Sequence, residues 1–257
     1  MGLLRFMAVC GIVFCVSCSI KEDRSVCPCV LKLDMTGIDT SAVKAADLFL
    51  YGPGNHFLSN ALEIDDSDEV FEVSVPRGLI KVLMYSGTDG LQVGMDGMRI
   101  PYGEDSPPVY MHSSEVEAYG EEATEKVVLY KNHCVLTVRM HSDDDFPFRL
   151  DFKGQVDGCL GDGSPSRGEF LYSAFPDGDN CCEVVLPRQL DDSLVLELND
   201  GTEVVKVFSL GKYIAVSGYD WTARNLQNIT MELDFVLSRF VVEVQEWDEV
   251  IISEVFI

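Results

Sequence analysis

The sequence predicts an all-β protein made of antiparallel β-sandwiches. Apolar and polar residues alternate in many short runs, which is the period of a half-buried strand. Turns rich in Gly, Pro and Asp separate these runs, and no extended helical period is present. Many short strands with turns at regular spacing are typical of β-sandwiches rather than of mixed α/β folds.

The N-terminus has the layout of a secretory signal over residues 1–17. Arg5 precedes an apolar run that is too short for a stable membrane span, which needs ~20 residues. The run ends just before Cys18 and resembles a lipobox, although Cys15 stands where leucine is usual. We therefore expect Cys18 to become the lipidated mature N-terminus. An ordinary cleaved signal, leaving a soluble secreted protein, is the alternative.

Residues 18–26 are predicted to be a lipidated tether. The tether contains Lys21-Glu22-Asp23, which resembles the surface-export signal of Bacteroidetes lipoproteins. A solvated polar linker explains the same three residues equally well. Several acyl chains on Cys18 would hold the protein firmly on a membrane, because each buried CH₂ contributes ~0.8 kcal/mol.

A first sandwich is predicted over residues 27–130. Its strand-like runs are 30–35, 43–51, 70–75, 79–85, 109–111 and 126–130. Pro76-Arg77-Gly78 lies between two of these runs, so we expect 70–75 and 79–85 to form an antiparallel hairpin. Residues 94–120 are rich in Gly, Pro and acids and are predicted to be long loops around the short strand 109–111.

A second sandwich is predicted over residues 131–257. Its strand-like runs are 134–140, 148–152, 170–175, 184–187, 194–198, 204–210, 226–236, 240–246 and 250–257. Asn199-Asp200-Gly201 separates two alternating runs, and an Asp-Gly pair in that place is a strong hairpin signal. The domain boundary falls near Lys131, and one large sandwich continuing through it is the alternative.

Six of the nine cysteines lie beyond Cys18 and are candidates for disulfides. Export into an oxidising compartment favours disulfides, but the sequence does not choose among the possible pairings. The adjacent pair Cys181 and Cys182 is expected to pair elsewhere or to stay free. A structural zinc site is not expected, because the usual Cys-x₂-Cys spacing is absent. The six candidates are Cys27, Cys29, Cys134, Cys159, Cys181 and Cys182.

Charge and motif content exclude several classes of function. The net charge of −24 argues against binding to nucleic acid or to anionic lipid surfaces, which requires Lys and Arg. None of the four histidines stands in a metalloprotease spacing, and neither a Gly-x-Ser-x-Gly elbow nor a phosphate loop occurs. The acidic runs 65–69 and 143–145 lack the EF-hand ligand order. We therefore expect no enzyme, no cofactor, no metal and no small-molecule substrate.

Segments at both ends of the chain resemble one family. Cys27-Pro28-Cys29-Val30-Leu31, just after a lipoprotein signal, resembles the start of the FimB/Mfa2 family of Bacteroidales fimbrial anchor subunits. Four C-terminal features agree with it: Phe208-Ser209-Leu210-Gly211-Lys212-Tyr213-Ile214, Gly218-Tyr219-Asp220-Trp221, Leu226-Gln227-Asn228-Ile229-Thr230 and Trp247. The resemblance implies two transthyretin-like β-sandwich domains in tandem on a surface-exposed lipoprotein of the outer membrane. It also implies that the protein holds the base of a fimbrium, limits its growth and has a fimbrial stalk subunit as its partner.

The last strand is the candidate for assembly. Fimbrial subunits of this kind polymerise by strand addition, in which one subunit completes the sheet of another. Residues 250–257 are apolar, β-prone and terminal, and the candidate donor residues are Val250, Ile251, Ile252, Val255, Phe256 and Ile257. The alternative is that they form the last core strand of the second sandwich. A different class of function, a surface lipoprotein that binds glycan or peptide through a sandwich face, also fits the sequence.

Overall fold

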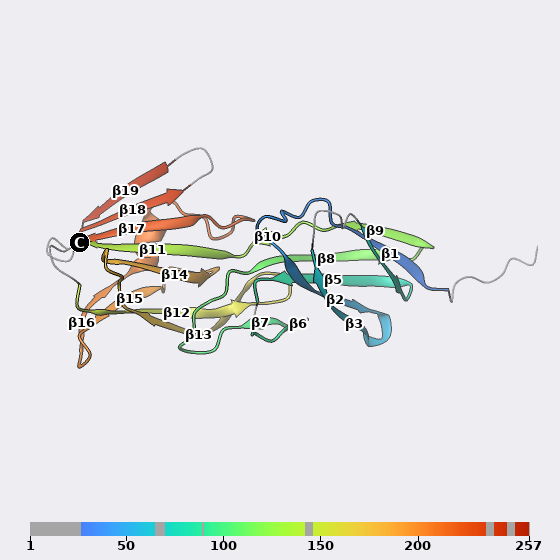
Figure 1. The fold of residues 1–257 in the computed structure, drawn as a ribbon, viewed down its shortest axis with the longest axis horizontal. Coiled ribbons are helices and arrows are strands. Elements are labelled where there is room, and N and C mark those ends of the chain that lie inside the picture. The colour runs from blue at the N-terminus through green and yellow to red at the C-terminus, as the bar shows by residue number, and fades with distance from the viewer. Residues whose placement is uncertain are drawn as a thin grey trace, which may run out of the picture.

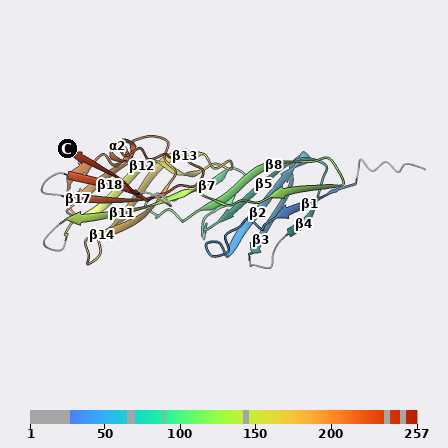
Figure 2. The same ribbon diagram turned by 90° about the horizontal axis from the view of Figure 1, so that it is seen from above.

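The structure, a computed structural model, describes residues 27–64, 70–88, 90–141, 146–234, 239–245 and 250–256. Strands make up nearly all of its regular elements, beside the short helix α2 (Leu210–Val216) and the 3-10 turn η2 (Pro53–Asn55). The predicted all-β class is therefore confirmed. Two groups of strands lie end to end along the long axis of the molecule (Figures 1 and 2).

The N-terminal group consists of two sheets. The smaller sheet has the order β4 (Val70–Val75), β1 (Cys29–Asp34), β9 (Glu122–Lys126). The larger sheet has the order β10 (Tyr130–Lys131), β8 (Tyr110–Ala118), β5 (Gly78–Ser86), β2 (Ala45–Gly52), β3 (His56–Glu63). Apolar side chains of β1, β4, β2, β5 and β8 meet between the two sheets and form one buried core.

The C-terminal group also consists of two sheets. One has the order β14 (Cys181–Pro187), β11 (His133–His141), β17 (Asn228–Asp234), β18 (Arg239–Gln245), β19 (Val250–Phe256). The other has the order β16 (Val204–Phe208), β15 (Val195–Asn199), β12 (Arg149–Cys159), β7 (Gly97–Arg99), β6 (Val93–Gly94), and β13 (Pro165–Ala174) also pairs with β12. A second core lies between these sheets.

The two groups repeat the same strand topology. In the first, β1 lies between an antiparallel β4 and a parallel β9. In the second, β11 lies between an antiparallel β14 and a parallel β17. The facing sheets match as well, because β8-β5-β2-β3 and β16-β15-β12-β13 are both entirely antiparallel. The two parallel pairs are a departure from the purely antiparallel pairing that the sequence predicted.

Alternating side chains explain why these segments are strands. On β1 every second residue is buried, and Leu31 and Leu33 are fully inaccessible. The strand β17 follows the same pattern with Ile229, Met231 and Leu233. Each fully buried Leu or Ile side chain stabilises the fold by about 1.5–3 kcal/mol relative to an exposed one.

Strand β5 contributes to both cores. Val82 and Met84 point into the core of the N-terminal group, whereas Leu83 and Tyr85 belong to the core of the C-terminal group. All four are fully buried, so β5 has a continuous apolar run in place of a simple alternation. The apolar packing therefore continues from one group into the other.

The sheet membership of some segments differs from the predicted division at Lys131. The hairpin β6–β7 lies within the range predicted for the first sandwich, yet β7 pairs with Gly158 and Cys159 of β12. The main chain leaves the sheet of β8 at Lys131 and enters the sheet of β14 at His133. The division into domains 27–130 and 131–257 stays a prediction.

Two local predictions are wrong. The strands at 70–75 and 78–86 do not form a hairpin, because β4 pairs with β1 whereas β5 pairs with β2 and β8. The turn between them instead carries the chain from one sheet to the facing sheet. Residues 94–120 are not mainly loops, because they contain β7 and the nine-residue strand β8. The alternation of apolar and polar residues identified strands that have one buried face, but it did not show which strands pair with each other in a sheet.

Candidate functional site

The strands β18 and β19 extend one sheet beyond the topology that the two groups share. In the described part of the N-terminal group, the sheet β4-β1-β9 ends at β9. The equivalent sheet of the C-terminal group continues past β17 with an antiparallel pair, in register from Arg239 opposite Phe256 to Gln245 opposite Val250. This added pair is the candidate assembly edge.

The two strands of the candidate assembly edge have different places in the sheet. Val242 and Val244 of β18 are buried in the C-terminal core, so β18 closes that core. Among the described strands, β19 pairs with β18 alone and is the outermost strand of its sheet. Five predicted donor residues, Val250, Ile251, Ile252, Val255 and Phe256, lie on β19, and Ile257 lies outside the described residues.

The equivalent edge of the N-terminal group, β9, differs from β19 in composition. The outer strand β9 carries Glu122, Glu125 and Lys126, and charged residues of this kind protect an edge from pairing with other chains. The sequence of β19, VIISEVF, has a single charge. An apolar strand at a sheet edge is a natural template for strand addition.

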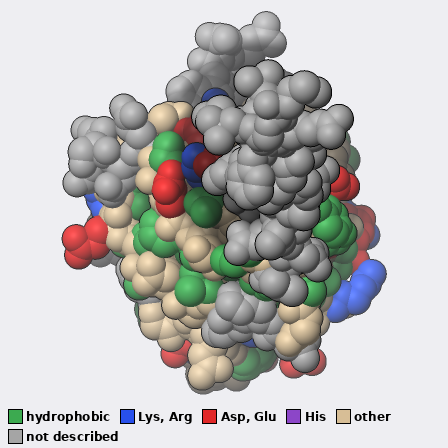
Figure 3. All heavy atoms as spheres, turned by 90° about the vertical axis from the view of Figure 1, so that its right-hand side faces the viewer, with side chains coloured by type: hydrophobic (Ala, Val, Ile, Leu, Met, Phe, Trp, Pro, Cys, Tyr) green, Lys and Arg blue, Asp and Glu red, His purple; other side chains and the backbone are tan. Residues whose placement is uncertain are grey.

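The two termini of the described fold lie far apart. The strand β1 begins at one end of the long axis, and β19 ends at the other (Figure 1). At the β1 end, the carbonyl oxygen of Cys27 accepts a hydrogen bond of 2.9 Å from Arg77 Nε. Figure 3 looks onto this end, where hydrophobic and acidic side chains are interspersed. Cys18 and Lys21-Glu22-Asp23 lie outside the described residues.

All six candidate disulfide cysteines are free thiols in the structure. Burial raises the pKa of Cys134 and Cys182 to about 12 and that of Cys159 to about 11, so these thiols stay protonated at neutral pH. Cys134 is opposite Leu186 and Cys182 is opposite Val138, an offset of four residues or ~13 Å along the strand, beyond disulfide reach. The disulfides stay a prediction.

Asn132, next to the predicted boundary at Lys131, forms hydrogen bonds at the junction between the two strand groups. Its backbone N–H donates to the Val109 carbonyl at 2.9 Å, and its Oδ1 accepts from Arg188 Nε at 2.8 Å. The same guanidinium donates to the carbonyl oxygens of Trp221, Ala223 and Arg224, the last two at 2.8 and 3.2 Å.

Histidines complete this junction. His133 is 3% exposed, and its Nδ1 is 3.0 Å from the Val109 carbonyl oxygen. Burial lowers the pKa of His133 to about 4, which keeps the ring neutral. His112 accepts a hydrogen bond from the Val128 N–H, and burial lowers its pKa as well. Asn132 and His133 stand between two apolar runs of the sequence, which is a signal by which these buried polar residues could have been found.

The described residues contain no group of three or more His, Cys, Asp or Glu placed to hold a metal ion. The acidic runs 65–69 and 143–145, which the sequence analysis weighed for calcium, lie outside them. No helix within the described ranges is long and apolar enough to cross a membrane.

No protein-family model and no curated protein matches this chain. Solved structures do resemble it. The fimbrial anchor protein Mfa2 from Porphyromonas gingivalis superposes with a TM-score of 0.58 at 13% identity, over 88% of this chain and 100% of that one. The chain has the fold of this fimbrial protein.

Two further structures share the fold. A candidate adhesin from Bacteroides thetaiotaomicron has a TM-score of 0.58 at 13% identity, over 89% of this chain and 99% of that chain. Another from Bacteroides ovatus has a TM-score of 0.58 at 11% identity, over 91% and 97%. The likeness therefore covers nearly the full length of each protein.

Proposed function

We propose that this protein is a structural anchor subunit of a surface fimbrium. A lipid on Cys18 holds it in the outer membrane, and the candidate assembly edge joins it to the first stalk subunit. The observation that carries this proposal is the fold shared with the fimbrial anchor Mfa2 along the whole of that chain. The placement of β1 and β19 at opposite ends of the molecule supports it, because the membrane side and the assembly side are then separate (Figure 1).

The edge strand supplies the contact in this proposal. The unpaired side of β19 offers backbone N–H and C=O groups to a strand of the stalk subunit, and the stalk side chains select the partner. Occupying the base of the fimbrium with a subunit fixed to the membrane limits its growth at that end. The role requires no catalytic group.

The test is a deletion in the source cell. Loss of the protein is expected to release fimbriae into the medium, and the full-length gene is expected to restore their attachment. A Cys18→Ser variant is expected to bind the stalk subunit but to shed fimbriae, because it cannot be acylated. Fimbriae that stay attached to cells lacking the protein would disprove the anchoring role.

Mass spectrometry of the mature N-terminus tests the tether separately. The expected product begins at Cys18 and carries acyl chains. An unacylated terminus would remove the membrane attachment from the proposal without affecting the contact with the stalk.

A further inference from the structure

An opening in the six-stranded sheet lies on one side of β12. On that side β12 pairs with β15 up to Lys153 and with β7 from Gly158 onward. Residues 154–157 lie between these two partners, and the Asp157 carbonyl accepts a hydrogen bond from Ile100 N–H. On the other side, pairing with β13 shifts register twice over the same stretch. Such bulges recur beside binding sites.

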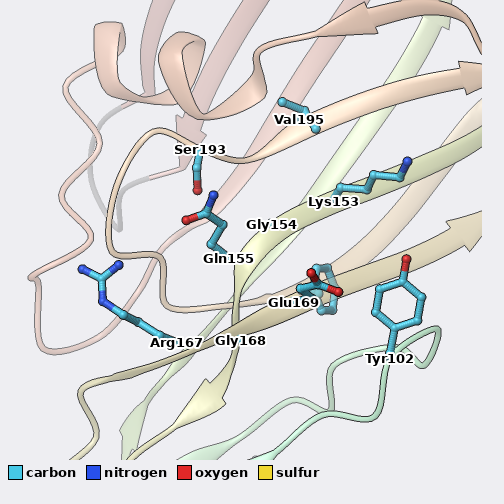
Figure 4. A pocket seen from close by; sticks show the side chains of 10 residues that line it. Tyr102, Lys153, Gly154, Gln155, Arg167, Gly168, Glu169, Ser193 and Val195 are labelled. Carbon is cyan, nitrogen blue, oxygen red and sulfur yellow. The ribbon is translucent and has the colours of Figure 1, made fainter.

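A pocket of about 700 Å³ lies at the β15 end of this opening and is lined by residues of β12 and β13 (Figure 4). Pockets of this size are in the range that holds small ligands. Its floor includes Gly168, where a Cβ atom would lie 2.0 Å from Asp157 Oδ2. Asp157 cannot easily move, because it bonds Arg99 at 2.7 Å and Ser166 Oγ at 2.8 Å. Glycine at this position therefore leaves room for the Asp157 carboxylate.

The wall of the pocket offers both hydrogen-bond donors and hydrogen-bond acceptors. Gln155 carries donors and an acceptor, Arg167 carries donors, and Glu169 carries acceptors. Ser193 Oγ is the one buried side-chain N or O atom, within the described residues, that lacks a partner of good hydrogen-bond geometry. Its hydroxyl lies beside Gln155 in Figure 4. This hydroxyl is inaccessible to a ligand in the structure, so the polar groups that the pocket offers are those of Gln155, Arg167 and Glu169.

An exposed aromatic ring stands across the pocket from these polar groups. Tyr102, on the segment between β7 and β8, is 63% exposed. An aromatic ring presents an apolar face, on which the C–H face of a sugar ring can pack while its hydroxyls reach polar neighbours. The combination of one open ring with several donors and acceptors suits a polyol.

Charge argues for a neutral ligand. Lys153 Nζ is 2.5 Å from Glu197 Oε2, so its charge is already neutralised. Arg167 and Glu169 then remain on the lining with opposite signs. A chain with a net charge of −24 also repels anionic ligands at longer range.

The shape of the opening argues against an extended peptide. The strands β15 and β7 close it at both ends, and the four residues between them span only ~13 Å. A strand could not continue through it. We infer that this pocket binds a neutral saccharide unit, so that the protein carries a glycan-binding site apart from the candidate assembly edge.

The test uses the full chain on an array of neutral, sialylated and sulfated oligosaccharides, followed by calorimetric titration of the best neutral glycan. Tyr102→Ala is expected to weaken binding about tenfold, which is the loss of one good ring contact. Tyr119→Ala is the matched control, since Tyr119 is 62% exposed but does not line the pocket, and it should leave the affinity unchanged.

A second pair of variants separates binding from folding. Gln155→Ala is expected to lower the affinity severalfold without changing the melting temperature, because Gln155 is exposed. The exposed Gln92, which lies outside this pocket, provides the control Gln92→Ala. The inference is overturned if no neutral glycan binds below ~10 mM, if only charged glycans or peptides bind, or if the Tyr102 and Tyr119 variants behave alike. None of these outcomes bears on fimbrial anchoring.

Discussion

At the scale of single residues, the junction between the two strand groups depends on Arg188. The hydrogen-bond partners described for this cation are uncharged. Arg188 is 8% exposed and spreads its donors over one side-chain amide and three carbonyl oxygens. Burial lowers the pKa of its guanidinium, but the group stays charged. The planar fork gives hydrogen bonds to four acceptors at once, of which the Asn132 amide oxygen is in a buried bond.

Arg188→Lys is therefore expected to destabilise the protein by about 2–4 kcal/mol, because an ammonium cannot reach these acceptors together. Urea unfolding followed by circular dichroism measures the loss. Arg224→Lys, at an exposed arginine, serves as the control and should change the stability by less than ~0.5 kcal/mol. Equal effects of the two variants would show that the network around Arg188 carries little energy.

His133 predicts a dependence of stability on pH. Unfolded His133 takes up a proton near pH ~6.5, whereas its folded pKa is lowered to about 4. Stability is therefore fully present above ~6.5 and falls as the pH drops toward 4, by about 3 kcal/mol in total. His133→Gln should make the curve of unfolding free energy against pH less steep in this window, and His112, whose pKa burial also lowers, should keep part of the slope. A wild-type curve that is already flat would contradict the prediction.

At the scale of elements, the sequence identified those strands whose side chains alternate at a single buried face. The run 70–75 coincides with β4, and the turn Asn199-Asp200-Gly201 joins β15 and β16 as a hairpin, as predicted. Asp200 Oδ1 accepts bonds from the N–H groups of Thr202 and Glu203, which is the turn chemistry that the sequence carried.

The elements that sequence analysis missed lack that local signal. The strand β8 buries the polar His112 and has Ser113, Ser114 and Glu115 at its centre, so no alternation marks it. The helix α2 is only seven residues long, too short for a helical period to stand out. The pocket beside β12 could not be predicted either, because it depends on where β15 and β7 end.

Removal of β19 separates its role in assembly from a role in core packing. A chain lacking residues 250–257 is expected to keep its strand content and a cooperative melting transition, because β18 already closes the core through Val242 and Val244. The same chain is expected to lose co-purification with the stalk subunit. Circular dichroism and a pull-down measure the two effects.

Removal of β18 and β19 together, by deleting residues 239–257, is the matched comparison. It exposes the C-terminal core and should unfold that strand group. If the shorter deletion already aggregates or unfolds, β19 is a core strand, and its separate role as the candidate assembly edge is disproved.

At the scale of the whole molecule, two strand groups of equal topology share buried apolar packing. The side chains of Leu83 and Tyr85 reach the C-terminal core from the N-terminal group, and β7 pairs with β12. We therefore expect one cooperative unfolding transition, with coincident curves by fluorescence and circular dichroism.

Gly97 tests this coupling. A Cβ atom there would lie 1.9 Å from the Cys159 carbonyl oxygen, so Gly97→Ala should separate β7 from β12 and cost more than ~3 kcal/mol. Gly103 has a similar positive φ of 92° but open space around it, so Gly103→Ala should cost only ~1 kcal/mol of backbone strain. If both variants lose the same free energy of unfolding in urea, the close approach of β7 to β12 at Gly97 does not contribute to stability.

The β6–β7 hairpin has a mechanical consequence. Traction applied between Cys27 and β19 would run lengthwise through the molecule, and the covalent connection at Lys131 would not carry it alone. The chain crosses between the groups three times, since it passes out to β6, returns to β8 and leaves again after β10. A tensile load is thus divided among these three crossings of the chain, and the two strand groups resist separation together.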